Sequence, residues 1–341
     1  MPVQAGAGRR QGLDGQPGTM NPSEFDICLA PMRGLTDAAF RNAYARFFTG
    51  VDLAVSPFLS TVRGTKIKAT HLEDVQPRNN AAMPLVPQVI GNDPGQFLLL
   101  SRALFDLGYD RINWNLGCPF PRVAKKRRGA GLLPFPDQVA AFLDAVMARI
   151  PPGALTLKMR LGYLHGDEIF SLLPRLDAYA LGGIVIHPRT GRQMYQGKPD
   201  LERFRQCLEM TRHPVTYNGD INSDAAFDAL QARLPGVTRW MIGRGILGDP
   251  FLPARIKGLR ADGAASVETL HRFHDALFAA YAERLSGPAH LVARMKGFWL
   301  YFSRAFSQGT DILKLIRKVR DDKQYKTLVN RFFETAVYAG L

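Results

Sequence analysis

Eight short apolar runs recur along the chain and alternate with segments of helical periodicity. The apolar runs lie at residues 27–32, 53–56, 85–90, 112–115, 155–159, 183–187, 215–218 and 240–243. The helical segments between them include residues 37–48, 94–107, 137–150, 167–181 and 224–234. This alternation is typical of βαβ units that build a parallel sheet. Eight such units predict a closed (β/α)8 TIM barrel, an α/β fold of about 250 residues.

A doubly wound open sheet is the structural alternative. Such a sheet normally places a glycine-rich phosphate-binding turn directly after its first strand. The first predicted strand ends in the sequence APMRG, residues 30–34, with one glycine at its end. The turn chemistry therefore favours the barrel.

The pattern changes after Leu259, where a short segment rich in glycine and alanine, residues 260–266, predicts a linker. Beyond it, apolar and aromatic residues recur at helical spacing. We expect residues 23–259 to form the barrel and residues 266–341 to form an all-helical domain. Residues 1–22 are glycine-rich and polar, and we expect a disordered tail, or a segment that precedes a natural start at Met20.

The composition bears on partners and compartment. The 341 residues include 44 Lys and Arg against 30 Asp and Glu, a net charge of +14. This excess indicates a polyanionic partner such as nucleic acid, since cations that neutralise phosphates release counterions; a soluble protein that is merely basic is the alternative. The cysteines Cys28, Cys118 and Cys207 are far apart, which argues against a metal site and a disulfide scaffold. We therefore expect no metal and a location in the reducing cytoplasm. No apolar run reaches the roughly 18 residues of a membrane helix, so we expect no membrane segment.

The ends of the predicted strands carry most of the residues that can do chemistry. In a (β/α)8 barrel the active site lies at the carboxyl ends of the strands. Gly219 and the sequence Gly243-Arg244-Gly245 follow the last two strands, where barrels commonly bind a phosphate through backbone N–H groups. Arg244 adds a charged donor. The alternative is that these glycines only permit tight turns.

Three charged or titratable residues end the fifth and sixth strands. Lys158 lies within an apolar strand, where a charge is costly unless it has a partner or a function. It can donate to an electron-rich ring such as flavin or form a Schiff base. His187 can be a structural histidine, but its clustering with Lys158 and Arg189 on one rim favours ligand binding.

Cys118 ends the fourth strand between Gly117 and Pro119. A free cysteine is usually a small core residue, but at a barrel rim it is well placed for proton transfer or nucleophilic attack. The loop that follows carries a basic cluster, which we expect to steer a phosphate-rich substrate toward the site. The cluster consists of Arg122, Lys125, Lys126, Arg127 and Arg128.

Six motifs together resemble the dihydrouridine synthase family. They are Ala30-Pro31-Met32, Asn115-Leu-Gly-Cys118-Pro119, Lys158-Met-Arg160-Leu-Gly162, His187-Pro-Arg189-Thr190, Asn218-Gly219-Asp220-Ile221 and Ile242-Gly243-Arg244-Gly245. They run in order and at the family's spacing from about Cys28 onward. The sequence Ala293-Arg294-Met295-Lys296, with Trp299 and Tyr301, is most similar to the subfamily that acts at position 16 of tRNA.

The resemblance implies a flavoenzyme that reduces tRNA uridine, with FMN as cofactor and NADPH as reductant. It implies that Cys118 is the general acid and that Asn115 positions the uracil. Arg33 stands where the family often has a small or acidic residue, and Pro188 where it usually has glycine; we expect Arg33 to lie beside the cofactor and substrate phosphate. The residues implied to hold FMN are Pro31, Met32, Gln88, Lys158, His187, Asn218, Asp220, Gly243 and Arg244.

Three alternatives remain open from the residues. They are an FMN-dependent barrel oxidoreductase acting on a small enone or a dihydroorotate-like molecule, an aldolase or isomerase that uses Lys158 on a phosphorylated sugar, and a catalytically silent RNA-binding protein. We expect a monomer. We also expect the helical domain to dock tRNA, through Arg317 and Lys318 among other cations, and to take no part in the catalytic site.

Overall fold

The computed structural model describes residues 25–259 and 266–340, so the predicted tail and most of the predicted linker lie outside the described residues. Its sheet has ten strands, and every pairing in it is parallel. The strands are β1 (Asp26–Leu29), β2 (Leu53–Val55), β3 (Leu59–Ser60), β4 (Leu85–Val86), β5 (Gln88–Ile90), β6 (Ile112–Leu116), β7 (Leu155–Gly162), β8 (Gly183–Thr190), β9 (Val215–Asn218) and β10 (Arg239–Ile242).

These ten strands make an eight-stranded barrel, because two of the eight are interrupted. The order of hydrogen-bonded neighbours runs β3-β5-β6-β7-β8-β9-β10-β1-β2-β4. Pro57 lies between β2 and β3, and Pro87 separates β4 from β5; proline has no backbone N–H to offer a ladder. The two pieces still pair in register, β2 with β4 and β3 with β5, so the ends of the order meet. The predicted TIM barrel is therefore confirmed.

Side chains on the strands alternate between two cores. On β7, Leu155, Leu157 and Met159 face the surrounding helices and are fully buried, whereas Lys158 points into the barrel, because successive side chains on a strand face opposite sides. A small apolar layer fills the interior of the barrel. It consists of Cys28, Ala30, Val55, Val86, Val185 and Met241. The same alternation directs Lys158, midway along β7, into the barrel interior.

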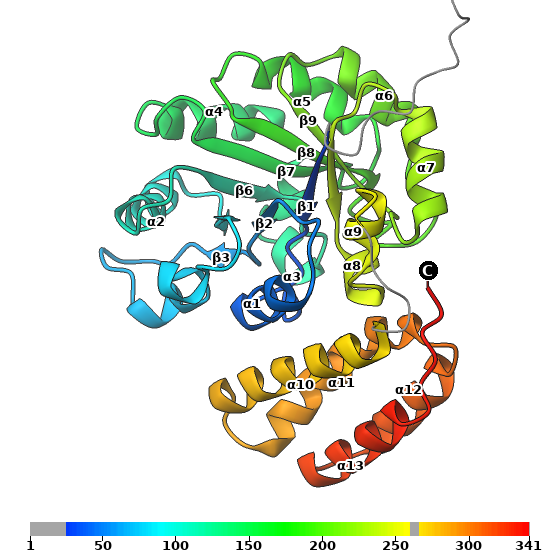
Figure 1. Cartoon of the computed structure of the whole chain (residues 1–341). Helices are drawn as coiled ribbons and strands as arrows, with labels where there is room; N and C mark the ends of the chain where they lie inside the picture. Colours follow the sequence, from blue (N-terminus) through cyan, green and yellow to red (C-terminus); the bar gives the residue numbers. More distant parts are fainter. Residues whose placement is uncertain (1–24, 260–265, 341) are drawn as a thin grey trace, which may run out of the picture.

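Helices surround the barrel, as Figure 1 shows. All five helical segments predicted from periodicity contain an α-helix, although α5 ends earlier than expected, at Leu176. The α-helices that accompany the barrel are α1 (Ala38–Phe47), α2 (Pro94–Asp106), α3 (Pro121–Ala124), α4 (Pro136–Met147), α5 (Glu168–Leu176), α6 (Leu201–Glu209), α7 (Asp224–Arg233), α8 (Arg244–Gly248) and α9 (Leu252–Ile256).

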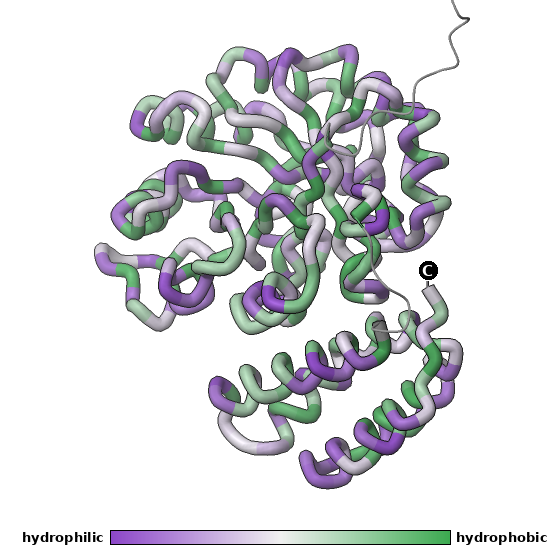
Figure 2. The backbone as a smooth tube through the Cα atoms, in the orientation of Figure 1, coloured by the Kyte–Doolittle hydropathy of each residue, from purple (hydrophilic) through white to green (hydrophobic). Residues whose placement is uncertain are grey.

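The rest of the described chain is helical and lies against one end of the barrel (Figure 1). Hydrophobic and hydrophilic stretches alternate along its helices, so that each helix has a face to bury (Figure 2). Aromatic rings fill its interior: Trp299 is fully buried and donates from Nε1 to the Tyr325 hydroxyl at 2.6 Å. The four α-helices are α10 (Ser266–Arg284), α11 (Pro288–Phe302), α12 (Gly309–Lys318) and α13 (Asp322–Phe333).

Polar and aromatic contacts join the helical region to the barrel. Arg294 of α11 pairs with Asp37, the N-cap of α1, at 2.7 Å, and the Tyr281 hydroxyl donates to the same carboxylate at 3.0 Å. Phe40 of α1 meets Phe273 of α10 edge to face, with ring centroids 5.9 Å apart. These contacts place α11 over the open end of the barrel.

Candidate active site

A cavity of about 250 Å³ opens at the carboxyl ends of the strands. The barrel wall and strand-end loops form most of it, and Tyr301 of α11 lines it from the helical region. The helical region thus reaches the cavity through Tyr301, because α11 packs over the barrel mouth, whereas its expected lack of a catalytic part stays a prediction. The sequence-predicted residues that line the cavity are Pro31, Met32, Arg33, Asn115, Cys118, Lys158, His187, Asn218, Gly219, Asp220, Gly243 and Arg244.

The Cys118 thiol lies at the cavity wall in a tightly fixed turn. Asn115 Oδ1 accepts hydrogen bonds from the backbone N–H of Gly117 at 3.1 Å and of Cys118 at 2.8 Å. Gly129 packs against Cys118 from behind, where a Cβ atom would come within 2.6 Å of the Cys118 carbonyl oxygen. Burial raises the pKa of the Cys118 thiol and outweighs the opposing charges of Arg160 and Arg33. The thiol is therefore protonated at neutral pH and can act as an acid.

Gln88 was predicted to contact the cofactor, but it is fully buried behind the cavity wall rather than on it. Its Nε2 donates to Asn113 Oδ1 at 2.8 Å, and its Oε1 accepts from Asn115 Nδ2 at 2.7 Å. The geometry thus gives Gln88 a positioning role, because it fixes the carboxamide of Asn115, which in turn holds Cys118.

Lys158 rises from β7 into the cavity and donates from Nζ to Asn218 Oδ1 at 2.7 Å. Asn218 is oriented by its own donation from Nδ2 to the Met241 carbonyl at 2.8 Å. Burial, with a further contribution from the positive charge of Arg160, lowers the pKa of Lys158 to about 7. A Lys158 that is partly neutral at pH 7 regains its proton readily when an electron-rich or anionic group enters the cavity.

Asp220 and Arg189 form an ion pair beside the cavity. Arg189 is 1% exposed and does not line the cavity. Its guanidinium donates to both oxygens of Asp220, to the carbonyls of Gln196 and Gly197, and to His187 Nε2. These contacts use all five N–H donors of an arginine. Direct binding of substrate by Arg189 is therefore not supported, because no donor is left for it.

His187 is neutral in this setting. Burial, together with the nearby charges of Arg160, Lys158, Arg189 and Arg244, holds its pKa well below the usual range. Because Arg189 donates to Nε2 at 3.1 Å, the imidazole proton is on Nδ1. His187 can thus present a neutral N–H donor to a ligand.

The loops after β9 and β10 form a cradle with a positive charge. A Cβ atom on Gly243 would lie 3.1 Å from both Ala30 Cβ and Met32 Sδ, and one on Gly245 would lie 2.1 Å from the Ile221 carbonyl oxygen. Arg244, the first residue of α8, donates to Asp220 Oδ1 at 2.6 Å and remains a quarter exposed. Close-packed glycine backbone beside an accessible guanidinium suits a phosphate group.

Two further side chains complete the wall and were not singled out from the sequence. Arg160, 2% exposed, donates to the Gly117, Thr190 and Met194 carbonyls through Nε and Nη1, and among described residues its Nη2 has no partner. Tyr195, 48% exposed, lies beside two guanidiniums, with Arg244 Cζ 4.8 Å and Arg160 Cζ 5.5 Å from its ring centroid. The motif Lys158-Met-Arg160 was the sequence signal that could have identified the arginine. The position of Tyr195 at the cavity depends on how its loop folds.

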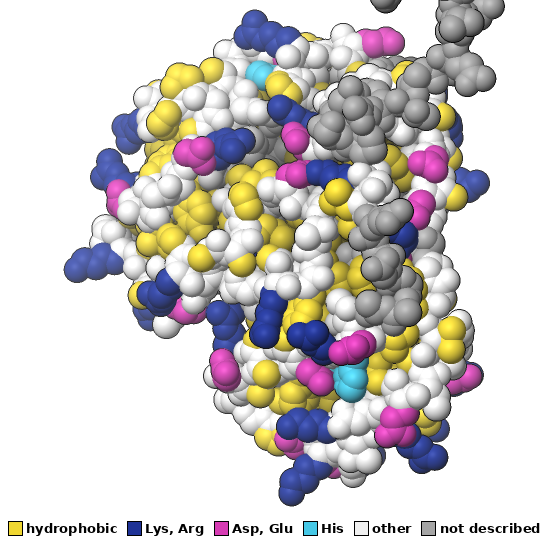
Figure 3. Space-filling view, viewed as in Figure 1, with side chains coloured by type: hydrophobic (Ala, Val, Ile, Leu, Met, Phe, Trp, Pro, Cys, Tyr) yellow, Lys and Arg dark blue, Asp and Glu magenta, His cyan; other side chains and the backbone are white. Residues whose placement is uncertain are grey.

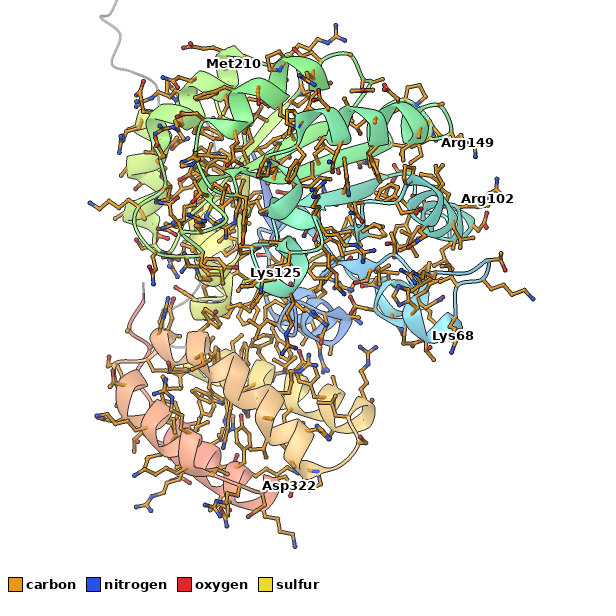
Figure 4. The ribbon with its side chains drawn as sticks, turned by 180° about the vertical axis from the view of Figure 1, so that it is seen from behind. Lys68, Arg102, Lys125, Arg149, Met210 and Asp322 are labelled. Carbon is orange, nitrogen blue, oxygen red and sulfur yellow. The ribbon has the colours of Figure 1, made fainter. Side chains whose placement is uncertain are left out.

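The basic cluster and the predicted docking residues lie outside the cavity lining. Lys125, Lys126 and Arg127 are exposed, and Figure 4 shows Lys125 at the side of the barrel nearest the helical region. Arg128 is tied by its Nε to Asn92 Oδ1 at 3.1 Å. Arg317 lines a separate groove of about 480 Å³ on the helical region, and Lys318 is exposed beside it. Cations are spread over both parts of the molecule on the face shown in Figure 3.

The described part of the chain contains no cluster of three or more His, Cys, Asp or Glu residues able to hold a metal. Within the same residues, no helix is both long and apolar enough to cross a membrane.

Comparison with known proteins gives a consistent result. Residues 28–336 match the family model described as Dihydrouridine synthase. A tRNA-dihydrouridine(16) synthase of Neisseria meningitidis is 26% identical over 330 residues, which cover 94% of this chain and 98% of that protein. A probable tRNA-dihydrouridine synthase of Staphylococcus epidermidis is 31% identical over 327 residues, covering 91% and 94%. The structure of an old yellow enzyme homologue from Zymomonas mobilis is similar in fold, with a TM-score of 0.50 over 71% of this chain and 91% of that chain at 13% identity.

Proposed function

Because the chain belongs to the dihydrouridine synthase family, we propose that it reduces the C5–C6 double bond of a uridine in tRNA, using FMN and NADPH. One observation carries this proposal beyond the family name. A protonated thiol, a depressed-pKa lysine, a neutral histidine and a glycine-arginine cradle all meet in one cavity at the carboxyl ends of the barrel strands. Together they offer an acid, donors for a polar ring and a phosphate site.

The residues present fit FMN. The cradle of Gly219, Gly243 and Arg244 would hold the phosphate, because it combines closely packed glycine backbone, where an added Cβ would lie 3.1 Å from its nearest neighbour, with an accessible guanidinium. Lys158 and His187 would donate to the polar edge of the ring system. Asn218 orients Lys158, and Arg189, itself held by Asp220, orients His187. Pro31 and Met32 would supply apolar contact. When bound, FMN supplies the hydride that adds to C6 of the uracil, with NADPH as the source of its electrons.

Cys118 would deliver the proton that completes the reduction at C5 of the uracil. Its raised pKa keeps the proton on sulfur until transfer. The positive charges of Arg160 and Arg33 would then stabilise the thiolate that remains, and solvent would return the proton. Asn115 would hold Cys118 in place through the backbone hydrogen bond, and the uracil would have to leave its stack to reach it.

The tRNA would be held outside the cavity by phosphate contacts. We assign these contacts to the exposed cations Lys125, Lys126 and Arg127, with Arg128 beside them, and to Arg317 and Lys318 on the helical region. Such contacts position an RNA without reading its sequence. Position 16 is the expected uridine, following the names of several relatives.

The test starts from the purified protein. It should be yellow, or should take up added FMN, and with NADPH should form dihydrouridine in a tRNA transcript. Colourless, folded protein that does not bind FMN would rule out the proposal and would favour an enzyme that uses Lys158 covalently. A flavoprotein that reduces a small enone but not tRNA would agree with FMN as the cofactor and would contradict tRNA as the substrate.

A further inference from the structure

Phe120 is an exposed aromatic ring at the mouth of the cavity. It follows Cys118 and Pro119 directly, lines the cavity, and is 56% exposed. A large apolar ring gains stability when it is buried, so this degree of exposure does not serve the fold. The proposed function gives the ring no role.

The backbone that carries this ring is held in a fixed conformation. Phe120 lies between Pro119 and Pro121 with φ −57° and ψ 129°, and its carbonyl accepts hydrogen bonds from Val123 at 2.8 Å and Ala124 at 2.9 Å. Proline on either side restricts the backbone further. Because the backbone is already ordered, little backbone entropy is lost when a ligand stacks on the ring.

Arg33 and Phe58 form a second element of the same mouth. The Arg33 guanidinium carbon lies 5.6 Å from the centroid of the Phe58 ring, and both residues line the cavity. Arg33 is exposed, and among described residues it makes no hydrogen bond or ion pair. Arg33 and Cys118 line the same cavity, and the charge of Arg33 acts to lower the pKa of the thiol, against the larger effect of burial. The guanidinium is thus oriented by stacking, while its donors stay available.

An exposed ring and an available guanidinium together match the chemistry of a nucleotide. Nucleobases stack on aromatic side chains, and arginine pairs with phosphate through two parallel N–H donors. Neighbouring nucleotides also lose stacking when a uridine turns out of its helix, so a surface that receives one of them favours the reactive arrangement. A second copy of the chain fits poorly, because Arg33, Arg122 and Lys125 would repel their counterparts.

We propose that Phe120 stacks on the nucleobase next to the reduced uridine, and that Arg33 pairs with the phosphate that joins the two nucleotides. This inference rests on the proposed function. It makes Phe120 and Arg33 determinants of which RNA sequence or loop shape is accepted, in addition to the residues that hold the uracil itself.

The test uses FMN-loaded full-length protein and a tRNA transcript whose reduced uridine has been located by mass spectrometry. Transcripts carrying 2-aminopurine on either side of that uridine report stacking by a fall in fluorescence. Wild type and Phe120→Trp should quench one of the two, and Phe120→Ala should not. Phe120→Ala should retain FMN and raise the KM for tRNA roughly 5- to 150-fold, as expected for the loss of one stacked base. Arg33→Ala should raise KM and flatten its salt dependence.

Val337→Ala, at a similarly exposed apolar residue outside the cavity, is the matched control and should behave as wild type. Unchanged KM and quenching in Phe120→Ala would overturn the inference, and so would loss of FMN, since Phe120 would then belong to the cofactor pocket. Failure of the wild-type protein to reduce any uridine would instead contradict the proposed function.

Discussion

The side-chain oxygen of Asn115 accepts the backbone N–H of Cys118 at 2.8 Å, while the Asn115 amide group donates to Gln88 Oε1 at 2.7 Å. The side-chain amide of Asn115 thus links Gln88, in the interior of the barrel, to Cys118, the residue proposed as the acid. Cys118 has little freedom to move, because each partner in this chain is itself fixed. The position of the thiol is therefore set before substrate arrives, which is how a barrel turns rigid strands into a catalytic geometry.

Replacing Cys118 with Ala should remove proton delivery while leaving the cofactor site intact. We expect FMN to stay bound and to remain reducible by NADPH, with uridine reduction slowed roughly 10²- to 10⁴-fold, the usual contribution of a general acid. Single-turnover mixing of pre-reduced protein with tRNA measures this step alone. A normal rate would show that Cys118 is structural. Wild-type activity should persist above the ordinary thiol pKa of about 8.5, because burial raises the pKa of Cys118.

Replacing Asn115 with Ala should destabilise the protein as well as the site. The change leaves the N–H groups of Gly117 and Cys118 and the buried Gln88 Oε1 without their partner. We expect the free energy of unfolding to fall by about 1–3 kcal/mol, as is usual for buried polar groups left unpaired. Denaturant unfolding measures it. The control is Asn92→Ala, whose hydrogen bonds are exposed and whose effect should be below about 0.5 kcal/mol. Equal losses in the two variants would contradict the role of Asn115.

Arg189 and Arg244 both contact Asp220, but they should respond differently to truncation. Arg189→Ala leaves the Gln196 and Gly197 carbonyls without their donor and leaves Asp220 paired with Arg244 alone, and it should cost about 1–3 kcal/mol of stability. Arg244 is a quarter exposed, so Arg244→Ala should cost much less stability and should instead weaken FMN binding. Thermal unfolding of the FMN-free proteins and titration with FMN separate the two effects. If the Arg189→Ala protein is stable and fails only to bind tRNA, Arg189 contacts the substrate directly.

Lys158 predicts a distinctive dependence of stability on pH. Burial lowers its folded-state pKa to about 7, whereas the unfolded value is about 10.4. Between these values the unfolded chain holds a proton that the folded chain lacks, so this lysine makes stability rise with pH over that window. In Lys158→Met the rise should be absent. Denaturant unfolding of FMN-free wild type and variant at pH 7, 8 and 9 measures it, and parallel curves would mean that Lys158 is charged throughout.

Reversing the charges of Arg317 and Lys318 should weaken tRNA binding. Arg317→Glu with Lys318→Glu should also flatten the dependence of affinity on salt, since each lost phosphate contact removes about 0.7–0.9 from the log–log slope. The matched control is Arg102→Glu with Arg149→Glu, two exposed arginines on a side of the barrel away from the helical region (Figure 4). Affinity measured at several salt concentrations decides it. Unchanged affinity and slope in the first pair would place tRNA elsewhere.

Periodicity was enough to predict the barrel, because strands buried on both sides read as apolar runs whatever the loops do. Pro57 and Pro87 interrupt the strand ladder because proline has no backbone N–H, and both prolines could be read from the sequence. Which strands they divide became clear only from the pairing of the pieces in the structure. The residues on strand ends were also predictable, since the fold brings such ends together.

What the sequence did not reveal concerns side chains whose partners come from folded loops. Arg189 looked available for substrate until the loop from Thr190 to Gly197 turned its carbonyls back onto the guanidinium. Tyr195 gained its place beside Arg160 and Arg244 from the same loop. Tyr301 reached the cavity only because α11 packs over the barrel, a long-range contact that no local pattern encodes.

The most direct measurement of the central claim is the mass of a tRNA transcript after incubation with FMN-loaded protein and NADPH. The account predicts that one uridine gains the mass of two hydrogens, that the gain requires FMN, and that it falls sharply in Cys118→Ala. A protein that binds FMN and oxidises NADPH, yet leaves the mass of every tRNA uridine unchanged across a full set of cellular tRNAs, would contradict it.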